Sequence, residues 1–150
     1  MATTETVKWH EAKVDTRLKL SALWTTVMFF YVYADLFAFF DPKALRQITD
    51  GTLLPFPITQ SMMLGFAVMM SIPTIMIFLS LALKANQSRW SNIVVGVVYT
   101  LVAAYTLTMP SSLSYRYFEC LEILCTGYIV WSAWKWLAQR AEARYSAEQI

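Results

Sequence analysis

Three carboxylates stand in parts of this chain that are otherwise apolar. Asp35 lies inside an apolar run that is long enough to span a membrane, and Glu119 and Glu122 lie at the start of another. A charged side chain at the centre of a membrane helix costs about 2.5–3.5 kcal/mol. Because a chain that keeps such residues generally has a partner or a use for them, these three are the first candidates for a functional site.

Counting along the helices places the three carboxylates at similar depth. Asp35 is five residues before the end of its run at Phe40, and Glu122 is five residues after the start of the last run at Tyr117. At 1.5 Å per residue, both are about 7–8 Å below the outer boundary of the membrane. Glu119 is three residues from Glu122, so the two share one helix face. We therefore expect one acidic layer near the outer boundary.

Two further residues belong to this predicted site. Tyr31 is four residues before Asp35 and so lies beside it on the same helix, and Arg116 is the nearest basic residue. Two carboxylates that are close together in a low dielectric cannot both ionise cheaply. Such a cluster suits proton exchange, cation binding or recognition of a cationic group. The predicted ligand- or ion-binding residues are Asp35, Glu122, Tyr31, Glu119 and Arg116.

A structural interpretation of the same residues stays open. Asp35 pairs in that case with Arg116 or with tyrosine hydroxyls and holds two helices together, as an interhelical clamp. Glu119, which is close to the boundary, then faces lipid headgroups or water.

Four apolar segments must position these residues. They cover about residues 18–40, 58–83, 90–109 and 117–137, and a cytoplasmic tail follows over 138–150. The chain is 57% hydrophobic and only 15% charged, whereas a soluble domain has about 25% charged residues. About 20 residues cross a hydrocarbon core, so all four segments qualify. The sequence predicts an all-α polytopic membrane protein, an antiparallel four-helix transmembrane bundle that forms a single domain over residues 1–150.

The distribution of Lys and Arg predicts the orientation of this bundle. Nine of these residues flank the ends that would lie on one side of the membrane, and three flank the other. The positive-inside rule then places both termini in the cytoplasm. Five tryptophans fall near the cytoplasmic ends of their spans, where amphipathic rings prefer the interface. They are Trp24, Trp90, Trp131, Trp134 and Trp136.

Prolines mark two local features. Pro73, inside the second span, leaves the carbonyl of Met69 without its helical partner and predicts a hinge or kink there. Pro42 opens the outer connection, where an amphipathic pattern ending at Asp50-Gly51 predicts a short helix, with an ordinary loop as the alternative.

In the third span, small residues follow a spacing that favours close helix contact, within the bundle or between protomers. They are Gly96, Thr100, Ala103 and Ala104.

The remaining residue types argue against several classes of function. Five methionines crowd the second span, but they are better explained as packing residues than as copper ligands. The single His10 and the separation of Cys120 from Cys125 exclude bis-histidine haem ligation within one chain and a redox CxxC pair. No motif for catalysis or phosphate binding is present. We therefore expect no cofactor, no metal site and no catalytic residue, and the net charge of +2 is too small to indicate nucleic-acid binding.

The first span carries a resemblance to a known family. The stretch 19–24, KLSALW, followed by Tyr31-x-Tyr33-Ala34-Asp35, resembles the first span of an uncharacterised bacterial family of four-span membrane proteins, a domain of unknown function. The resemblance covers nearly the whole chain by segment layout, but its specific motif lies in the first span. It implies a multi-pass protein of the bacterial inner membrane and carries no activity across.

Three hypotheses about function arise from these patterns. The first is a small transport or permeation protein with a proton or cation site at the outer-leaflet carboxylates, which we expect to form a homo-oligomer. The second is a non-catalytic accessory or scaffold protein whose carboxylates are clamps, and which contacts a protein partner through the outer loop or the C-terminal tail. The third is an intramembrane enzyme or a protein that binds a lipid or a quinone. The lipid bilayer is a partner in all three.

Overall fold

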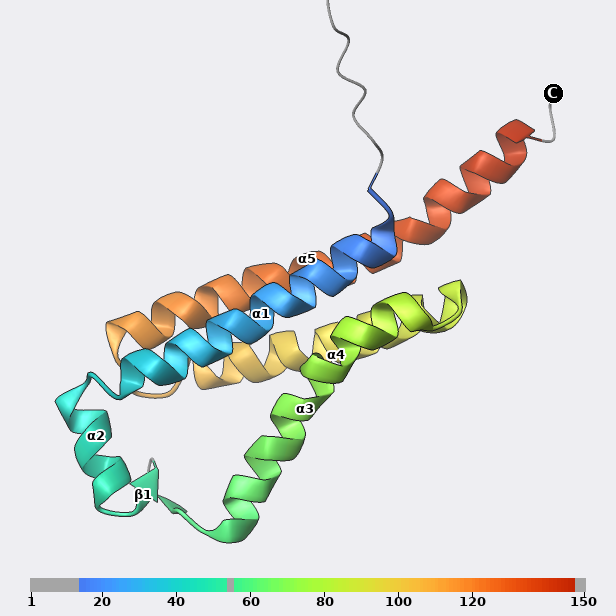
Figure 1. Cartoon of the computed structure of the whole chain (residues 1–150). Coiled ribbons are helices and arrows are strands. Elements are labelled where there is room, and N and C mark those ends of the chain that lie inside the picture. Colours follow the sequence, from blue (N-terminus) through green and yellow to red (C-terminus); the bar gives the residue numbers. More distant parts are fainter. Residues whose placement is uncertain (1–13, 54–55, 148–150) are drawn as a thin grey trace, which may run out of the picture.

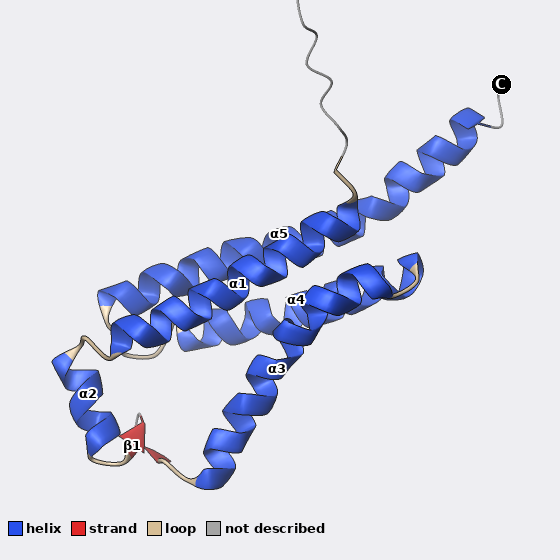
Figure 2. Ribbon diagram, in the orientation of Figure 1, coloured by secondary structure: helices blue, strands red, loops and turns tan. Residues whose placement is uncertain are grey.

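The computed structural model of this protein describes residues 14–53 and 56–147, and no side chain after Trp136. Most of the N-terminal flank, with His10, lies outside the described residues, as do the last three residues of the predicted tail. The chain is dominated by helices in the order α1, α2, α3, α4, α5, with one small β-hairpin between α2 and α3. The prediction of an all-α fold is confirmed at this level (Figure 2).

The first helix, α1 (Thr16–Ala38), corresponds to the first predicted span. Asp15 caps it, because its carboxylate accepts a hydrogen bond from the backbone N–H of Arg17 at 2.8 Å. The helix ends shortly before Pro42, whose preceding residue is biased towards extended backbone.

The connection between α1 and α3 folds into a short helix and a hairpin. The helix α2 (Pro42–Thr49) starts with proline in its first turn and with Asp41 as N-cap, which accepts from the N–H of Lys43 at 2.9 Å. The predicted short helix is therefore confirmed against the ordinary-loop alternative. Gly51 follows with a φ of +72°, a conformation that glycine adopts without steric cost. The strands β1 (Thr52–Leu53) and β2 (Phe56–Pro57) then pair antiparallel, which the sequence did not indicate.

The other long helices are α3 (Gln60–Ala82), α4 (Ala85–Thr106) and α5 (Leu113–Ala147). Helix α4 begins five residues before the predicted span, because the polar residues of its first turn are compatible with a helix. Helix α5 continues ten residues past the predicted span, through a stretch rich in strong helix formers such as Ala, Glu and Arg. Its 35 residues make it about 52 Å long at 1.5 Å per residue.

The helices do not form a regular four-helix bundle. Helices α1, α4 and α5 run side by side, with α5 packed against both others (Figure 1). Helix α3 packs against α1 and α4 only over its second half, and its first half stands away from the bundle (Figure 1). Its buried residues are Pro73, Met76 and Ser80. Helix α3 is apolar all round, so no single face directs its whole length onto the other helices.

The four-span prediction is only partly supported. Helices α1 and α3 are long and apolar enough to cross a membrane, and the described parts of α4 and α5 do not reach the same hydropathy. Helix α4 starts with polar residues around Asn92, and α5 carries Glu119 and Glu122 in its first turns. The fold by itself therefore supports membrane association through two helices, and the finer topology belongs to the proposal below.

The core lies where α1, α3, α4 and α5 meet. It includes Leu20, Trp24 and Val27 of α1, together with Ile129 and Ala133 of α5, all of them with no exposed surface. The predicted interfacial position of Trp24 is therefore wrong. A second tryptophan, Trp136, is also buried, with 7% exposed. The rings of Trp90, Trp131 and Trp134 are at least half exposed, as an interfacial position requires.

Candidate functional site

The two glutamates of α5 both face the interior of the bundle. Glu119 is 2% exposed and Glu122 is 4% exposed. They belong to the buried stripe of α5 that continues through Thr126 and Ile129, because residues three and four apart share a helix face. The interpretation of Glu119 as a residue facing headgroups or water is therefore wrong. The shared face of the two glutamates follows from their spacing, as predicted.

Glu119 lacks the partners that a buried carboxylate ordinarily has. Among the described residues, neither of its carboxylate oxygens has a hydrogen-bond partner. The hydroxyl of Thr106 lies nearby, but it donates to the carbonyls of Val102 and Ala103, at 3.2 and 3.1 Å. A buried polar group without a partner costs about 1–3 kcal/mol, and a charged group costs more. The position of Glu119 is thus energetically costly.

Helix α1 brings Asp35 and Tyr31 to the same end of the bundle. Tyr31 is half-buried and packs against the core, and it lies in the electrostatic field of Glu122. Glu122 in turn lies in the field of both Glu119 and Asp35. Asp35 itself is exposed on the surface of α1. The structure therefore brings the three carboxylates together from two helices, with Asp35 at the edge and the glutamates inside.

Tyr115 is a member of this cluster that the sequence did not single out as a site residue. It is half-buried at the start of α5, and the charges of Asp35, Glu119 and Glu122 all act on its hydroxyl group. Its position could have been inferred from the spacing, because Tyr115 is four residues before Glu119 on the same helix.

Arg116 does not neutralise the cluster through an ion pair. Its side chain is exposed, and the carboxylate on which its charge acts is Glu119. It makes no hydrogen bond to either oxygen of Glu119, and no contact among the described residues joins it to Asp35. The Asp35–Arg116 clamp is therefore not formed.

Aromatic side chains, rather than ions, hold α1 against α5 beside the cluster. The ring of Phe118 lies 6.2 Å from that of Phe30, 6.3 Å from that of Tyr33 and 5.8 Å from that of Phe37. Aromatic pairs with centroids 4.5–7 Å apart contribute about 0.5–1.5 kcal/mol beyond the area they bury. Contact between the two helices here does not depend on the carboxylates.

The predicted hinge residue, Pro73, is buried within a continuous helix. The carbonyl of Met69, which lacks its usual donor because proline has no N–H, accepts a hydrogen bond from the hydroxyl group of Tyr99 on α4. The sequence identified the orphaned carbonyl but could not identify its partner, because that partner comes from another helix. The hinge itself stays a prediction.

A second polar cluster lies deeper in the bundle, and sequence reasoning missed it. The amide oxygen of Asn92 accepts from the indole N–H of Trp24 at 2.7 Å and from the hydroxyl of Ser80 at 3.1 Å. Its amide nitrogen donates to the carbonyl of Ser88 at 2.7 Å, and the hydroxyl of Ser88 donates to the carbonyl of Ser80 at 3.0 Å. All four residues have no exposed surface. Since their polar groups are satisfied by one another, this cluster joins α1, α3 and α4 and is not a binding site.

A third polar contact joins α4 and α5. The hydroxyl of Thr100 donates to that of Thr126 at 2.8 Å, one turn from a close approach at Gly96. A Cβ atom at Gly96 would lie 2.8 Å from a methyl carbon of Val130 on α5, closer than real contacts allow. The close helix contact predicted from small residues is thus confirmed within the chain at Gly96 and Thr100, whereas Ala104 is exposed.

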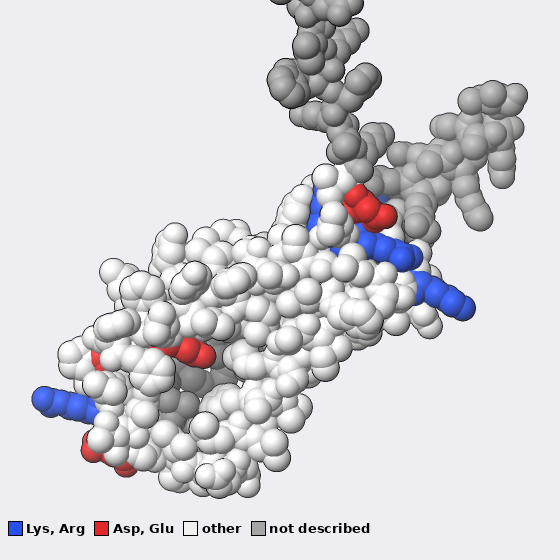
Figure 3. All heavy atoms as spheres, viewed as in Figure 1, with Lys and Arg blue, Asp and Glu red and all other residues white. Residues whose placement is uncertain are grey.

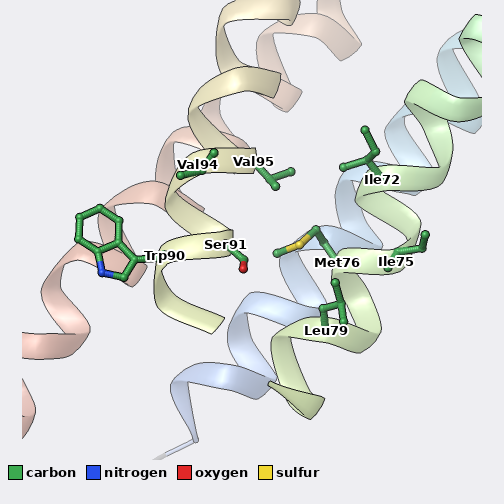
Figure 4. A pocket seen from close by; sticks show the side chains of 8 residues that line it. All are labelled: Ile72, Ile75, Met76, Leu79, Trp90, Ser91, Val94 and Val95. Atoms are coloured by element: carbon green, nitrogen blue, oxygen red, sulfur yellow. The ribbon is translucent and has the colours of Figure 1, made fainter. Parts of the chain in front are cut away.

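A groove between two of the long helices is distant from the carboxylates. It has a volume of about 490 Å³ and lies between the second half of α3 and the first half of α4 (Figure 4). Its lining is apolar except for Ser91 and the indole of Trp90. Such a lining offers no carboxylate to a cation, so the groove is not part of the predicted site.

The donor set of the acidic cluster limits what it could hold. Within the described segments, no three His, Cys, Asp or Glu side chains are close enough to share one metal ion. Cys120 is exposed and Cys125 is half-buried, and both are free thiols. The arrangement is chemically suited to a proton or to a singly charged cation that accepts few ligands.

The fold and the site define a class: small helical proteins with two membrane-type helices and a buried acidic cluster near one end of the bundle. The chain belongs to a family of unknown function, DUF6326, whose model matches residues 5–143. The resemblance to an uncharacterised family is confirmed at that level. No curated protein and no solved structure matches the chain.

Proposed function

We propose that this protein is a small multi-pass protein of the bacterial inner membrane that binds a proton or a small cation at its outer-leaflet carboxylates and passes it on. The observation that carries the proposal is Glu119, a carboxylate that is 2% exposed and has no hydrogen-bond partner for either oxygen among the described residues. A buried carboxylate of this kind is stabilised when it takes up a proton or a cation.

The exposed apolar surface supports a place in the bilayer. Large apolar side chains of α3 such as Leu64, Val68 and Phe78 are 55–68% exposed, although α3 is the most apolar helix of the chain. A core helix of a soluble protein would bury such residues, and contiguous exposed apolar surface marks contact with a membrane or with another protein. We propose that all four long helices span the bilayer, with α4 and α5 sheltered by their neighbours.

The charges support an orientation with both ends inside. The start of α1, the turn between α3 and α4 and the far part of α5 lie at one end of the bundle (Figure 1). In the view of Figure 3, most blue Lys and Arg side chains gather at that end, beside one red acidic group, and the other red acidic side chains lie near the opposite end together with a further blue side chain. By the positive-inside rule, the carboxylate end faces outwards.

The alternative of a scaffold protein with carboxylate clamps has less support. The aromatic cluster around Phe118 already holds α1 against α5, and the Asp35–Arg116 pair is not formed. A homo-oligomer, and a protein partner at the outer loop or the tail, stay predictions.

The experiment is a flux assay in liposomes that contain the purified protein and a pH-sensitive dye, with potassium and valinomycin to set the potential. We expect Glu119→Gln, Glu122→Gln and Asp35→Asn to reduce the proton or cation flux to the level of protein-free liposomes. Asp50→Asn, in the exposed outer connection, is the matched control and should transport normally. Wild-type flux in all three site variants, with normal insertion, would refute the proposal.

A further inference from the structure

Arg89 is held in a geometry that leaves part of its guanidinium group unused. Its Nε donates to the carbonyl of Ala133 on α5 at 3.2 Å. Its flat face lies 5.2 Å from the ring centroid of Trp90 and 5.9 Å from that of Trp134. Among the described residues, no hydrogen bond or ion pair uses its two terminal Nη groups. The hydrogen bond from Nε therefore fixes the orientation of the guanidinium group, and the two Nη groups are the donors that remain.

Lys135 is exposed on α5, one residue after Trp134. Its ammonium nitrogen is 4.1 Å from the ring centroid of Trp131. Trp131 and Trp134 are three residues apart, so they share one face of this helix, and they are 50% and 62% exposed. Two cations and three tryptophan rings, including that of Trp90, therefore form a region at the inner end of α4 and α5, with Arg89 beside Trp90 and Trp134 and Lys135 beside Trp131. We call it the Arg89–Lys135 patch.

Among the side chains that the structure describes, no carboxylate pairs with the cations of the patch. Among the described side chains, the acidic residue at this end of the bundle is Asp15, and it caps α1 by accepting from Arg17 N–H. Arg17, another cation at this end, is occupied elsewhere: it donates to the carbonyl of Leu81 at the end of α3 and lies over the ring of Trp136. Within the described part of the chain, the patch is therefore a cationic surface whose Arg89 Nη groups have no hydrogen-bond acceptor.

We propose that the Arg89–Lys135 patch binds the phosphates of anionic phospholipids of the inner leaflet. An oriented guanidinium binds phosphate through two parallel hydrogen bonds, and an ammonium group adds a point charge. Exposed tryptophans prefer the depth of the headgroups, so they place both cations at the level of lipid phosphates. Each Lys or Arg near an anionic leaflet contributes about 1 kcal/mol of attraction. The inference uses the proposed place in the bilayer but not the proposed flux.

The test compares how two lipids, phosphatidylglycerol and phosphatidylcholine, stabilise and bind the whole purified chain in detergent. We expect phosphatidylglycerol to raise the unfolding temperature more than phosphatidylcholine does, and to stay bound to the protein in native mass spectrometry. Lys135→Gln should weaken this preference, and Arg89→Gln with Lys135→Gln should abolish it. Lys135→Gln is the safer single variant, since the contact of Lys135 within the described residues is with the ring of Trp131, whereas Arg89 also donates to a carbonyl of α5.

Controls separate the patch from general electrostatics. Lys43→Gln and Arg46→Gln remove the same charge from the exposed outer helix α2 and should leave the preference for phosphatidylglycerol intact. Inorganic phosphate at the same concentration should not stabilise the protein. Equal stabilisation by inorganic phosphate, an equal response to both lipids, or an unchanged preference in the double variant would overturn the inference. A loss of flux in the carboxylate variants would leave the lipid preference unchanged, so the two proposals can fail separately.

Discussion

The hydrogen bond between Trp24 and Asn92 allows a quantitative test of the buried polar cluster. The indole N–H of Trp24 donates to the amide oxygen of Asn92 at 2.7 Å, and neither residue has any exposed surface. In Asn92→Leu, this N–H loses its acceptor and has no water to replace it. Leaving a buried donor unpaired costs about 1–3 kcal/mol. We therefore expect Asn92→Leu to destabilise the protein by at least that amount.

A double-mutant cycle isolates the hydrogen bond from the packing that each substitution also changes. In the double variant, Trp24→Phe removes the unpaired N–H, so Asn92→Leu should be less costly than in the wild-type background. Interhelical hydrogen bonds in membrane proteins average about 0.6 kcal/mol in such cycles and reach about 1.7. Because water is fully excluded here, we expect a coupling free energy near the upper end, about 1.5 kcal/mol.

The assay is equilibrium unfolding in mixed micelles, followed by circular dichroism so that the loss of one tryptophan does not affect the signal. The control cycle pairs Trp24→Phe with Thr126→Val, which has no hydrogen bond to Trp24 or Asn92. Residues without a shared partner should be additive within about 0.3–0.5 kcal/mol. A Trp24–Asn92 coupling no larger than that of the control would refute our account of the cluster.

Two other sites yield predictions of stability. Gly96→Leu should destabilise the protein by about 1–3 kcal/mol, because the new side chain overpacks against α5. Gly127→Leu is the control and should cost little, since a Cβ atom there meets nothing within 4 Å. Equal unfolding temperatures of the two variants would contradict the close contact at Gly96. Tyr99→Phe should cost about 1 kcal/mol by removing the donor to the Met69 carbonyl. Pro73→Ala should reduce that cost, since alanine restores the helical N–H. An identical cost of Tyr99→Phe in the wild-type and Pro73→Ala backgrounds would show that the hydroxyl has another role.

The features that the sequence could predict are local. The start of α2 at Pro42 and the shared face of Glu119 and Glu122 depend on caps and on helical periodicity, which are properties of neighbouring residues. The orphaned carbonyl of Met69 follows from the position of Pro73 in the same way.

The features that the sequence could not predict depend on which side chains from different helices meet. Trp24 has the apolar ring and polar N–H that favour an interfacial position, but Asn92 provides a hydrogen-bond acceptor for that N–H in the core. Glu119 has the position of a headgroup neighbour, yet packing of α4 and α5 buries it. The sequence also could not predict that the first half of α3 stands away from the other helices. A helix that is apolar all round does not indicate which face will pack against its neighbours.

The buried cluster at Asn92 also bears on the order in which the molecule can assemble during synthesis. Its four residues, Trp24, Ser80, Ser88 and Asn92, all precede α5 in the chain, and three of them lie on either side of the short turn between α3 and α4. Chains emerge from the ribosome from the N-terminus, at about 5–20 residues per second. Helices α1, α3 and α4 can therefore satisfy their polar groups before Glu119 and Glu122 exist. Helix α5, which carries the two glutamates, would then pack last, against α1, α3 and α4 that are already joined by the hydrogen bonds around Asn92.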